Sequence, residues 1–317
     1  MRFRADFSDY GLRVLEKGFL PTLEKFGKTC QVILKPDAVF FVQTTVNTDG
    51  THVSARFTVD KLFDTDTYVC QSKHHNLIAF TIELTLLSRV LRGAMTNSAT
   101  SVQVKLSQHT VTNAEGHQET KPILAFTGRG NSMSITQEMP VSRPFTALEI
   151  DQLVECKDVS ILCPFYVDLA PATQVLQGLV DKIRSLGDTA LLAMARNGDV
   201  HLQVTSPNIS LGSQIRGLHV FPEAAATAQP TDRQLPADQQ LQAALTSREA
   251  VSVRLLLKHL SKVLAIQGLT NPSQILCGIA ERGAYVHLLM VYRHTSNESE
   301  YDDNMALTFK LPVRMDD

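Results

Sequence analysis

Hydrophobic and polar positions along the chain describe one succession of elements that occurs twice. The first half opens on an alternating run, RFRADF (Arg2 to Phe7), which predicts a short strand. A helical pattern follows from Leu12 to Phe26, and Pro21 should bend or interrupt that helix because it lacks an amide N–H. Two apolar runs around a Lys35-Pro36-Asp37 turn then predict a hairpin.

The second half repeats this order. VSILCPF (Val159 to Phe165) predicts a strand, and Leu169 to Leu186 predicts a helix. Two apolar runs around Asn197-Gly198-Asp199 follow, and Asn-Gly between such runs is the strongest short signal for a hairpin. The two halves lie about 158 residues apart when Phe3 is aligned with Ile161.

Each half then shows a second strand–helix–strand unit. In the first half its parts are Ile78 to Leu84, Thr85 to Met95 and Ser101 to Leu106; in the second they are Val251 to Leu255, Leu256 to Ile266 and Gln274 to Tyr292, the last turning at Glu281-Arg282-Gly283. An internal repeat of this kind predicts two similar domains. We therefore expect an α+β protein in which each domain packs two helices on antiparallel sheet.

Between the two copies lies Met139 to Asp158, with prolines at Pro140 and Pro144 and no sustained apolar period. We interpret this stretch as a connector. The expected organisation is a first domain over residues 1–138, a connector over 139–158 and a second domain over 159–317. Within the second domain, Phe221 to Glu249 is rich in Ala, Gln and Pro, which predicts a flexible insertion over 221–249.

Length and composition fit a globular chain. At 317 residues there is room for two cores, and the hydrophobic and charged shares, 44% and 20%, are ordinary. No apolar run approaches the ~18 residues of a membrane span, and the first residues show no signal-peptide core, so we expect a cytosolic or nuclear protein without membrane association. Five scattered cysteines without a CxxC pair indicate free thiols in a reducing compartment.

The net charge is only −2, but its distribution is uneven. In and beside the four predicted helices, eleven Lys and Arg stand against four acids, about +7 in all. The rest of the chain carries 19 basic and 28 acidic residues, about −9. The helices are therefore basic while the remainder is acidic.

Two of the helices carry like charges on one face. Arg89 and Arg92 are three residues apart on the second helix, and Lys258 and Lys262 are four apart on the fourth, with no acid within reach to pair with them. Like charges at these spacings repel by roughly a few tenths of a kcal/mol, and a polyanion bound against them would remove the repulsion. For one helix alone a merely solvated face is the favoured interpretation, but the repeat of the pattern in both halves shifts the balance toward a functional surface.

The sequence shows no motif of a known catalytic or metal site. A Walker loop, GxSxG, HExxH and paired CxxC are all absent, and the adjacent His74-His75 cannot bind zinc from one helix face. We expect no catalytic residue, no metal site and no cofactor. An α+β enzyme with a dispersed active site stays open as an alternative, because catalytic groups need not be adjacent in sequence.

Four short strings resemble one protein family. They are MRFRA at the start, GKTC (Gly27 to Cys30), KPD (Lys35 to Asp37) and NPSQILC (Asn271 to Cys277). Together they resemble the Hus-type subunit of the DNA-damage checkpoint clamp, the nine–one–one ring, which has the sliding-clamp fold. The resemblance implies a non-enzymatic subunit of a heterotrimeric ring that encircles DNA at damage sites and serves as a platform for checkpoint signalling and repair enzymes.

The same resemblance implies partners and a location. They are two other clamp subunits of the Rad type, double-stranded DNA bound without regard to sequence, a clamp loader and repair enzymes, in the nucleus and also the cytoplasm. The sequence departs from expectation in lacking a Lys/Arg-rich import signal, so a partner or another route would bring the chain into the nucleus. The alternative within the fold is a homotrimeric replication clamp of the proliferating-cell-nuclear-antigen type.

The resemblance also assigns surfaces by position in this sequence. Residues expected to face DNA are Lys17, Lys25, Arg89, Arg92, Lys182, Arg184, Lys258 and Lys262. Subunits should meet edge to edge through Ser132 to Glu138 and Asn208 to Arg216, represented by Ser132, Ser134, Thr136, Ile209, Leu211 and Ser213. An outer groove for partner peptides should involve Phe145, Leu148, Ile150, Leu153 and Val154, and simple packing of these residues onto the sheet is the alternative.

Overall fold

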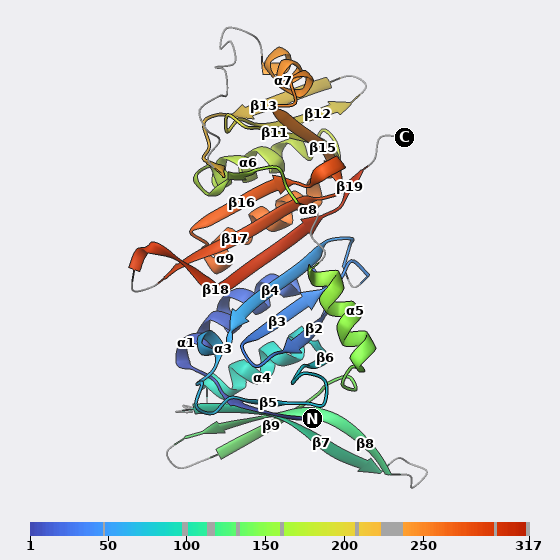
Figure 1. Cartoon of the computed structure of the whole chain (residues 1–317), viewed down its shortest axis with the longest axis vertical. Helices are drawn as coiled ribbons and strands as arrows, with labels where there is room; N and C mark the ends of the chain where they lie inside the picture. The colour runs from blue at the N-terminus through green and yellow to red at the C-terminus, as the bar shows by residue number, and fades with distance from the viewer. Residues whose placement is uncertain are drawn as a thin grey trace. The chain divides into compact units, whose positions relative to one another are not determined.

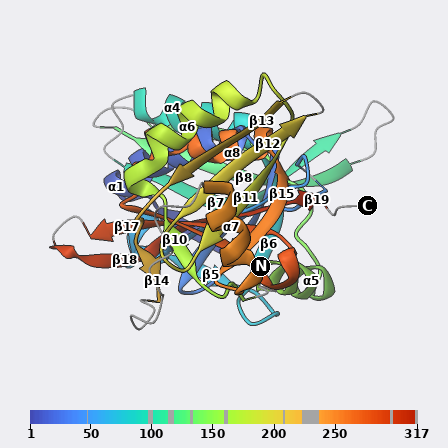
Figure 2. The ribbon, with the colours of Figure 1, turned by 90° about the horizontal axis from the view of Figure 1, so that it is seen from above.

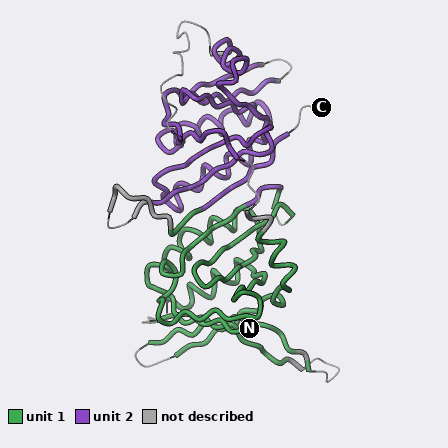
Figure 3. The backbone as a smooth tube through the Cα atoms, viewed as in Figure 1, with its two compact units in different colours: residues 1–49, 53–159, 304–306 green, residues 50–52, 160–303, 307–317 purple. Residues whose placement is uncertain are grey.

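The computed structural model describes the chain in two compact units (Figure 3). Unit 1 comprises residues 1–49, 53–159 and 304–306, and unit 2 comprises residues 50–52, 160–303 and 307–317. The residues that the structure describes are 1–46, 48–96, 101–112, 118–130, 134–158, 162–206, 209–222, 237–294 and 297–314. The stretch predicted as a connector falls within unit 1.

Unit 1 contains two sets of antiparallel strands (Figure 1). The first runs in the order β4 (His52–Thr58), β3 (Ala38–Gln43), β2 (Thr29–Leu34) and β6 (Ile78–Glu83). The second runs in the order β5 (Val69–Gln71), β1 (Arg2–Asp6), β7 (Ser101–Thr112), β8 (Gln118–Arg129) and β9 (Ser134–Pro140).

Unit 2 repeats both strand orders. One set runs β13 (Ile209–Ile215), β12 (Val200–Ser206), β11 (Thr189–Ala195), β15 (Ala250–Leu256) and β19 (Val313–Arg314). The other runs β14 (Val220–Phe221), β10 (Tyr166–Asp168), β16 (Gln274–Ile279), β17 (Val286–His294) and β18 (Asn297–Leu311). The duplicated succession of elements in the sequence thus corresponds to a duplicated sheet topology.

The first helix of unit 1 changes its winding before its proline. It consists of α1 (Asp9–Val14), a π-helical segment (Leu15–Phe19) and α2 (Leu20–Glu24). Pro21 lies in the first turn of α2, directly after the π-helical segment, and it has no N–H to donate to the preceding turn. The predicted interruption near Pro21 is confirmed, and it takes the form of a local π-helix. The remaining helices of the unit are α3 (Val59–Leu62), α4 (Leu84–Thr96) and α5 (Ala147–Asp158).

In unit 2 the helices lie on both faces of the sheet that contains β11. A 3-10 turn (Ala170–Ala172) leads into α6 (Thr173–Ile183), which packs beside α8 (Leu257–Leu264) (Figure 2). The short α9 (Gln267–Thr270) follows α8, and a 3-10 turn (Glu281–Gly283) joins β16 to β17. Helix α7 (Ala237–Thr246) packs against β13 and β15 on the face opposite α6 (Figure 1).

Both predicted hairpins form. Strands β2 and β3 pair with Leu34 opposite Val39, and β11 pairs with β12 through the Asn-Gly turn. Gly198 in that turn has a φ of +85°, and a side-chain carbon there would lie 2.0 Å from the carbonyl oxygen of Leu218. Glycine is therefore required at this position by both backbone conformation and space.

Four sequence expectations are corrected. Val159 to Phe165 is not a strand where the structure describes it, and β10 begins only at Tyr166, after Pro164, which has no N–H to offer a ladder. The alignment of Phe3 with Ile161 is therefore wrong, because β10 occupies the place of β1 in the strand order. The connector contains the 12-residue helix α5, and the second half of the insertion is the packed helix α7, which buries Gln240 and Leu241.

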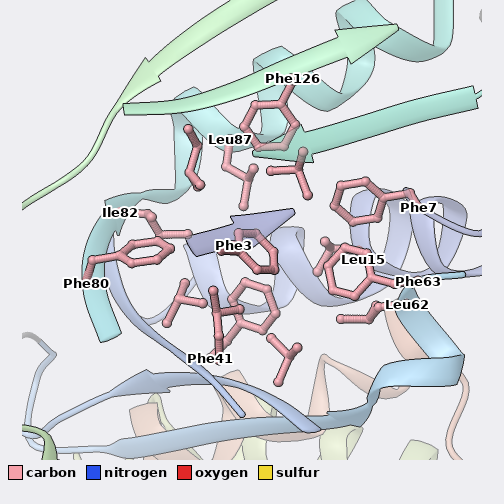
Figure 4. Close-up of a pocket in the computed structure, with 15 residues that line it drawn as sticks. Phe3, Phe7, Leu15, Phe41, Leu62, Phe63, Phe80, Ile82, Leu87 and Phe126 are labelled. Carbon is pink, nitrogen blue, oxygen red and sulfur yellow. The ribbon is translucent and has the colours of Figure 1, made fainter. Parts of the chain in front are cut away.

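The core of unit 1 is built on two strands that are apolar on both faces. Val32, Leu34, Val39 and Phe41 point from β2 and β3 toward β1, β7 and β8, where they line an entirely apolar cavity of about 40 Å³ (Figure 4). The alternate residues of β2 and β3 contact α5 instead. None of the described helices is both long and apolar enough to span a membrane.

Candidate nucleic-acid interface

The predicted cations of unit 1 are exposed on its helices. Lys17 lies on the π-helical segment, Lys25 caps α2, and Arg89 and Arg92 lie on α4. Their helices bury the apolar side of the same turns, including Leu15, Phe19, Leu23, Leu87 and Leu91. Burial of that stripe fixes which face each helix turns to solvent, and the cations occupy that face.

In unit 2 the cations are less evenly exposed. Lys258 on α8 is exposed, while Lys262 in the last turn of α8 is half-buried. Lys182 and Arg184 are exposed at the end of α6. The neighbouring Asp181 accepts a hydrogen bond of 3.3 Å from Ser261, so this acid links α6 to α8.

One of these cations has an acid partner that the sequence analysis missed. Arg92 donates from Nε to Oε1 of Glu16 at 2.8 Å, joining α4 to the π-helical segment. The Glu16 side chain is only 10% exposed, whereas that of Arg92 is 62% exposed. The expectation that no acid can reach Arg92 is wrong, because the two residues are 76 positions apart and meet only through tertiary packing.

The exposed cations of this surface are chemically suited to contact a phosphate backbone. Lysine and exposed arginine on helix faces attract a phosphate backbone through charge, and contacts to phosphates carry no direct sequence information. The exposed members without an acid partner among the described residues are Lys17, Lys25, Arg89, Lys182, Arg184 and Lys258. The arrangement is suited to a polyanion bound without regard to sequence.

Both strands predicted to meet other subunits lie at the edge of a described set of strands. Strand β9 pairs only with β8, and β13 pairs only with β12 within their units. Ser134 and Thr136 are exposed, Leu211 is 40% exposed and Ser213 is half-buried. Ser132 lies outside the described residues, and so does the side chain of Ile209. Unpaired backbone N–H and C=O groups along such edges are templates for strand addition.

The predicted partner groove is filled by the chain itself. Ile150 and Leu153 of α5 are buried against Ile33, Phe40 and Val42 on the outer face of β2 and β3. Phe145 and Val154 pack at the margin of this cluster, and Leu148 is 68% exposed. In this conformation Ile150 and Leu153 are not open to a partner peptide, because the helix buries its own apolar stripe on the sheet.

The start of α5 is held by a capping box that the sequence analysis did not use. The Thr146 backbone N–H donates to Glu149 Oε2 at 2.7 Å, and the Glu149 N–H donates to Thr146 Oγ1 at 3.4 Å. Arg143 adds two hydrogen bonds to the same carboxylate, at 2.7 and 3.0 Å. The hydrogen bonds from Arg143, which have the largest effect, and those from Thr146 lower the pKa of Glu149 to about 2.

The described residues contain no group of three or more His, Cys, Asp or Glu arranged to hold a metal ion. Burial raises the pKa of Cys70 to about 11 and raises that of Cys30 and Cys277 further. These three thiols therefore stay protonated at neutral pH and are poor nucleophiles.

Comparison with known proteins gives a family and a fold. The chain matches the family described as Hus1-like protein over residues 1–314. It is similar to the checkpoint protein hus1 homolog of Dictyostelium discoideum, with 22% identity over 315 residues that cover 99% of this chain and 98% of the relative. It is also similar to checkpoint protein hus1 of Schizosaccharomyces pombe, with 26% identity over 224 residues, 69% of this chain and 70% of the relative.

Among solved structures, the chain resembles the proliferating cellular nuclear antigen of Entamoeba histolytica. The TM-score is 0.59 at 12% sequence identity, over 99% of both chains. At this identity the likeness concerns the fold alone. It confirms the α+β sliding-clamp architecture expected from the sequence.

Proposed function

This chain belongs to the Hus1-like family and is a non-enzymatic subunit of the DNA-damage checkpoint clamp, and we propose that the helices of both its units face double-stranded DNA inside the ring. Its clamp partners would be two subunits of the Rad type. A clamp loader would place the ring on DNA, and repair enzymes would dock on its outside. The nucleus is the compartment where such a ring acts.

The observation that supports the DNA contact is the exposure of cations at corresponding helices of the two repeats. Arg89 on α4 and Lys258 on α8 are both exposed on helices whose other side is buried in the core. A ring that slides must bind phosphates and not bases, since base contacts would hold it at one sequence. Lysine and arginine on rigid helices meet this requirement.

Retention on DNA tests the proposal. The double substitution Arg89→Glu and Lys258→Glu should shorten the lifetime of the assembled ring on linear duplex DNA, where a ring can slide off the ends, and reduce its dependence on salt, because a ring that binds fewer phosphates displaces fewer counterions from the DNA. Arg92 is left intact because its partner Glu16 would face a second carboxylate. A ring carrying Arg282→Glu, an exposed cation on the turn between β16 and β17, serves as the matched control. Equal retention of the helix variant and the control would contradict the proposal.

Subunit contact through β9 and β13 is the second part of the proposal. A proline cannot donate to an intermolecular ladder, so Thr136→Pro on β9 and Leu211→Pro on β13 should each prevent assembly with one partner. Thr136→Ser and Leu211→Val are the matched controls. Assembly of both proline variants into normal rings would show that other edges are used.

The oligomeric state of the chain alone separates the two kinds of clamp. Light scattering of the purified 35.0 kDa chain should give a species near the mass of one copy, because its edges require other subunits. A stable species of three copies would instead favour a ring that closes on itself, as in the replication clamp.

Partner peptides would reach the outer groove only where α5 moves. Leu148 is the exposed apolar residue of this helix.

A further inference from the structure

A second basic surface lies in unit 1 on the sheet formed by β5, β1, β7, β8 and β9, on the face turned away from the core. Arg2 and Arg4 alternate on β1 with the buried Phe3 and Ala5, so both arginines turn to the solvent face of the sheet. Lys105 on the neighbouring strand β7 is exposed on the same face, directly opposite Arg4 in the antiparallel register. We call Arg2, Arg4 and Lys105 the β1–β7 basic patch.

The charges of this patch are not neutralised within the chain. Among the described residues, none of the three side chains has an ion pair or hydrogen bond. The acids on the same face have other partners: Asp6 accepts a hydrogen bond of 2.6 Å from Gln103, and Glu138 is paired with His109 at 2.8 Å. Ala125 lies between Lys105 and Glu138 in the register, so no long side chain shields Lys105 on that side.

Such an arrangement is unfavourable for the isolated fold. Like charges directly opposite each other on antiparallel strands repel, and Arg4 and Lys105 are such a pair. The patch also stands out against the rest of the chain, because the sequence outside the helices is acidic overall. An anion bound over Arg4 and Lys105 would remove the repulsion.

The spacing of the patch indicates the shape of that anion. Side chains two residues apart on a strand are about 6.6–6.8 Å apart, which is the separation of Arg2 and Arg4 along β1. An extended peptide with acids at alternate positions presents carboxylates at the same interval. One such carboxylate would meet Arg2 and the next would lie between Arg4 and Lys105.

We propose that the β1–β7 basic patch is a docking surface for an acidic, extended peptide segment of a partner protein, with Asp or Glu at alternate positions. Arginine suits this role because its planar guanidinium can donate two parallel hydrogen bonds to one carboxylate. The contact is electrostatic, so we expect fast binding that weakens as salt increases. The site is separate from the helix cations proposed to face DNA and does not depend on them.

The test uses the full chain and a fluorescent peptide of alternating Glu and Thr, about 12 residues long, which in extended form exceeds the length of β1. Anisotropy should detect binding at low salt. The double substitution Arg4→Glu and Lys105→Glu should weaken it about tenfold or more, because two of the three patch cations become repulsive. The single substitution Lys105→Glu should weaken binding while leaving the melting temperature unchanged or higher, since it creates an opposite-charge pair with Arg4.

Three controls make the outcome decisive. Arg314→Glu reverses another exposed strand cation that lies opposite an arginine, Arg254, and should leave peptide binding unchanged. The helix variant Arg89→Glu with Lys258→Glu should also bind the peptide normally. A peptide with its glutamates in one block and its threonines in another should bind less tightly than the alternating peptide.

Some results would overturn the proposal. Equal binding to the patch variants and to the Arg314→Glu control would remove the patch as the site. Loss of binding only in the helix variant would mean that the peptide competes for the DNA surface. Tighter binding of a single-stranded oligothymidylate, with the same sensitivity to Arg4→Glu and Lys105→Glu, would make the patch a nucleic-acid contact instead.

Discussion

Arg92 on α4 and Glu16 on the π-helical segment form an ion pair of 2.8 Å between the two helices of unit 1. The acid is nearly buried and the base is mostly exposed. One member of the predicted DNA surface therefore also holds two helices together. Comparison with the neighbouring Arg89 can separate these two roles of Arg92. Arg89 is exposed and has no acid partner among the described residues.

Arg92→Ala should destabilise unit 1, because it leaves the Glu16 carboxylate buried without its partner. We expect a loss of about 1–3 kcal/mol in the free energy of unfolding. Arg89→Ala, the control one turn earlier on the same helix, should change it by less than about 0.5 kcal/mol. Urea unfolding followed by circular dichroism measures both. Similar stabilities of the two variants would show that the ion pair contributes little.

The charge of Glu149 should persist far into acid. Hydrogen bonds from Arg143 and Thr146 lower the pKa of this carboxyl to about 2, below the ~4.3 of an unfolded chain. Because the folded pKa is the lower one, the stabilising contribution is complete above pH ~4.3 and is lost as the pH falls toward 2. A carbon-13 NMR titration of the Glu149 side chain should show its midpoint near 2.

Arg143→Met should move that midpoint upward toward the ordinary value, because the largest cause of the shift is removed. The exposed Arg129→Met, on β8, is a control that should leave it in place. An unchanged midpoint in Arg143→Met would mean that the Thr146 capping box alone sets the charge of Glu149.

The apolar cavity of unit 1 should accept an added methyl group. Val104→Ile extends a lining side chain into about 40 Å³ of empty space, which should stabilise the fold by about 0.5–1 kcal/mol. Val263→Ile adds the same group at a fully buried position of α8 away from the cavity, where overpacking should cost about 1–3 kcal/mol. Thermal unfolding of the two variants should therefore shift in opposite directions, and a shift of the same sign would contradict this account of the cavity.

His287 should titrate well below an ordinary histidine. Its Nδ1 shares a hydrogen bond of 2.9 Å with the Tyr166 hydroxyl, and burial, followed by the charge of Lys310, lowers the pKa of the imidazole to about 4. The folded pKa lies below the unfolded value of ~6.5. The stability that unit 2 owes to a neutral His287 is therefore complete above pH ~6.5, and it is lost as the pH falls toward 4. Proton NMR of the His287 ring should show a midpoint near 4.

This pair depends on a glycine in the strand between its members. Tyr166 and His287 lie on either side of Gly278 in the sheet, and a side-chain carbon at Gly278 would come within 2.9 Å of the Tyr166 ring. Gly278→Ala should therefore displace the tyrosine, uncover the imidazole and raise the pKa of His287 toward 6.5. Gly268→Ala is the control, because a side-chain carbon there meets nothing within 4 Å. An unshifted His287 in Gly278→Ala would show that the tyrosine does not shield it.

The sequence by itself determined the repeated elements and the basic character of the helices. Alternation in RFRADF, the Asn197-Gly198 turn and the proline in the first helix are local signals, and each corresponds to a local conformation in the structure. Such signals act within a few residues, so they can be read without knowledge of the fold. The four strings that resemble the Hus-type family pointed to the function before any contact was known.

Signals for α5 were present in the sequence but were not used. Thr146 and Glu149 have the spacing of a capping box, and Ile150, Leu153 and Val154 follow at helical spacing. The continuous apolar run of β3 also indicated that both of its faces would be covered. The prolines before α5 led to its interpretation as a connector, although proline commonly precedes or begins a helix.

Only the tertiary structure determined which charged side chains lie next to one another or next to a hydrogen-bond partner. Glu16 meets Arg92 across 76 residues, Asp181 meets Ser261 across 80, and Arg4 faces Lys105 only through the strand register. Periodicity says which face of an element is polar, but it contains no information about which other element packs beside that face. Pairing of distant charges follows from packing of the apolar cores, and so it could be seen only in the folded chain.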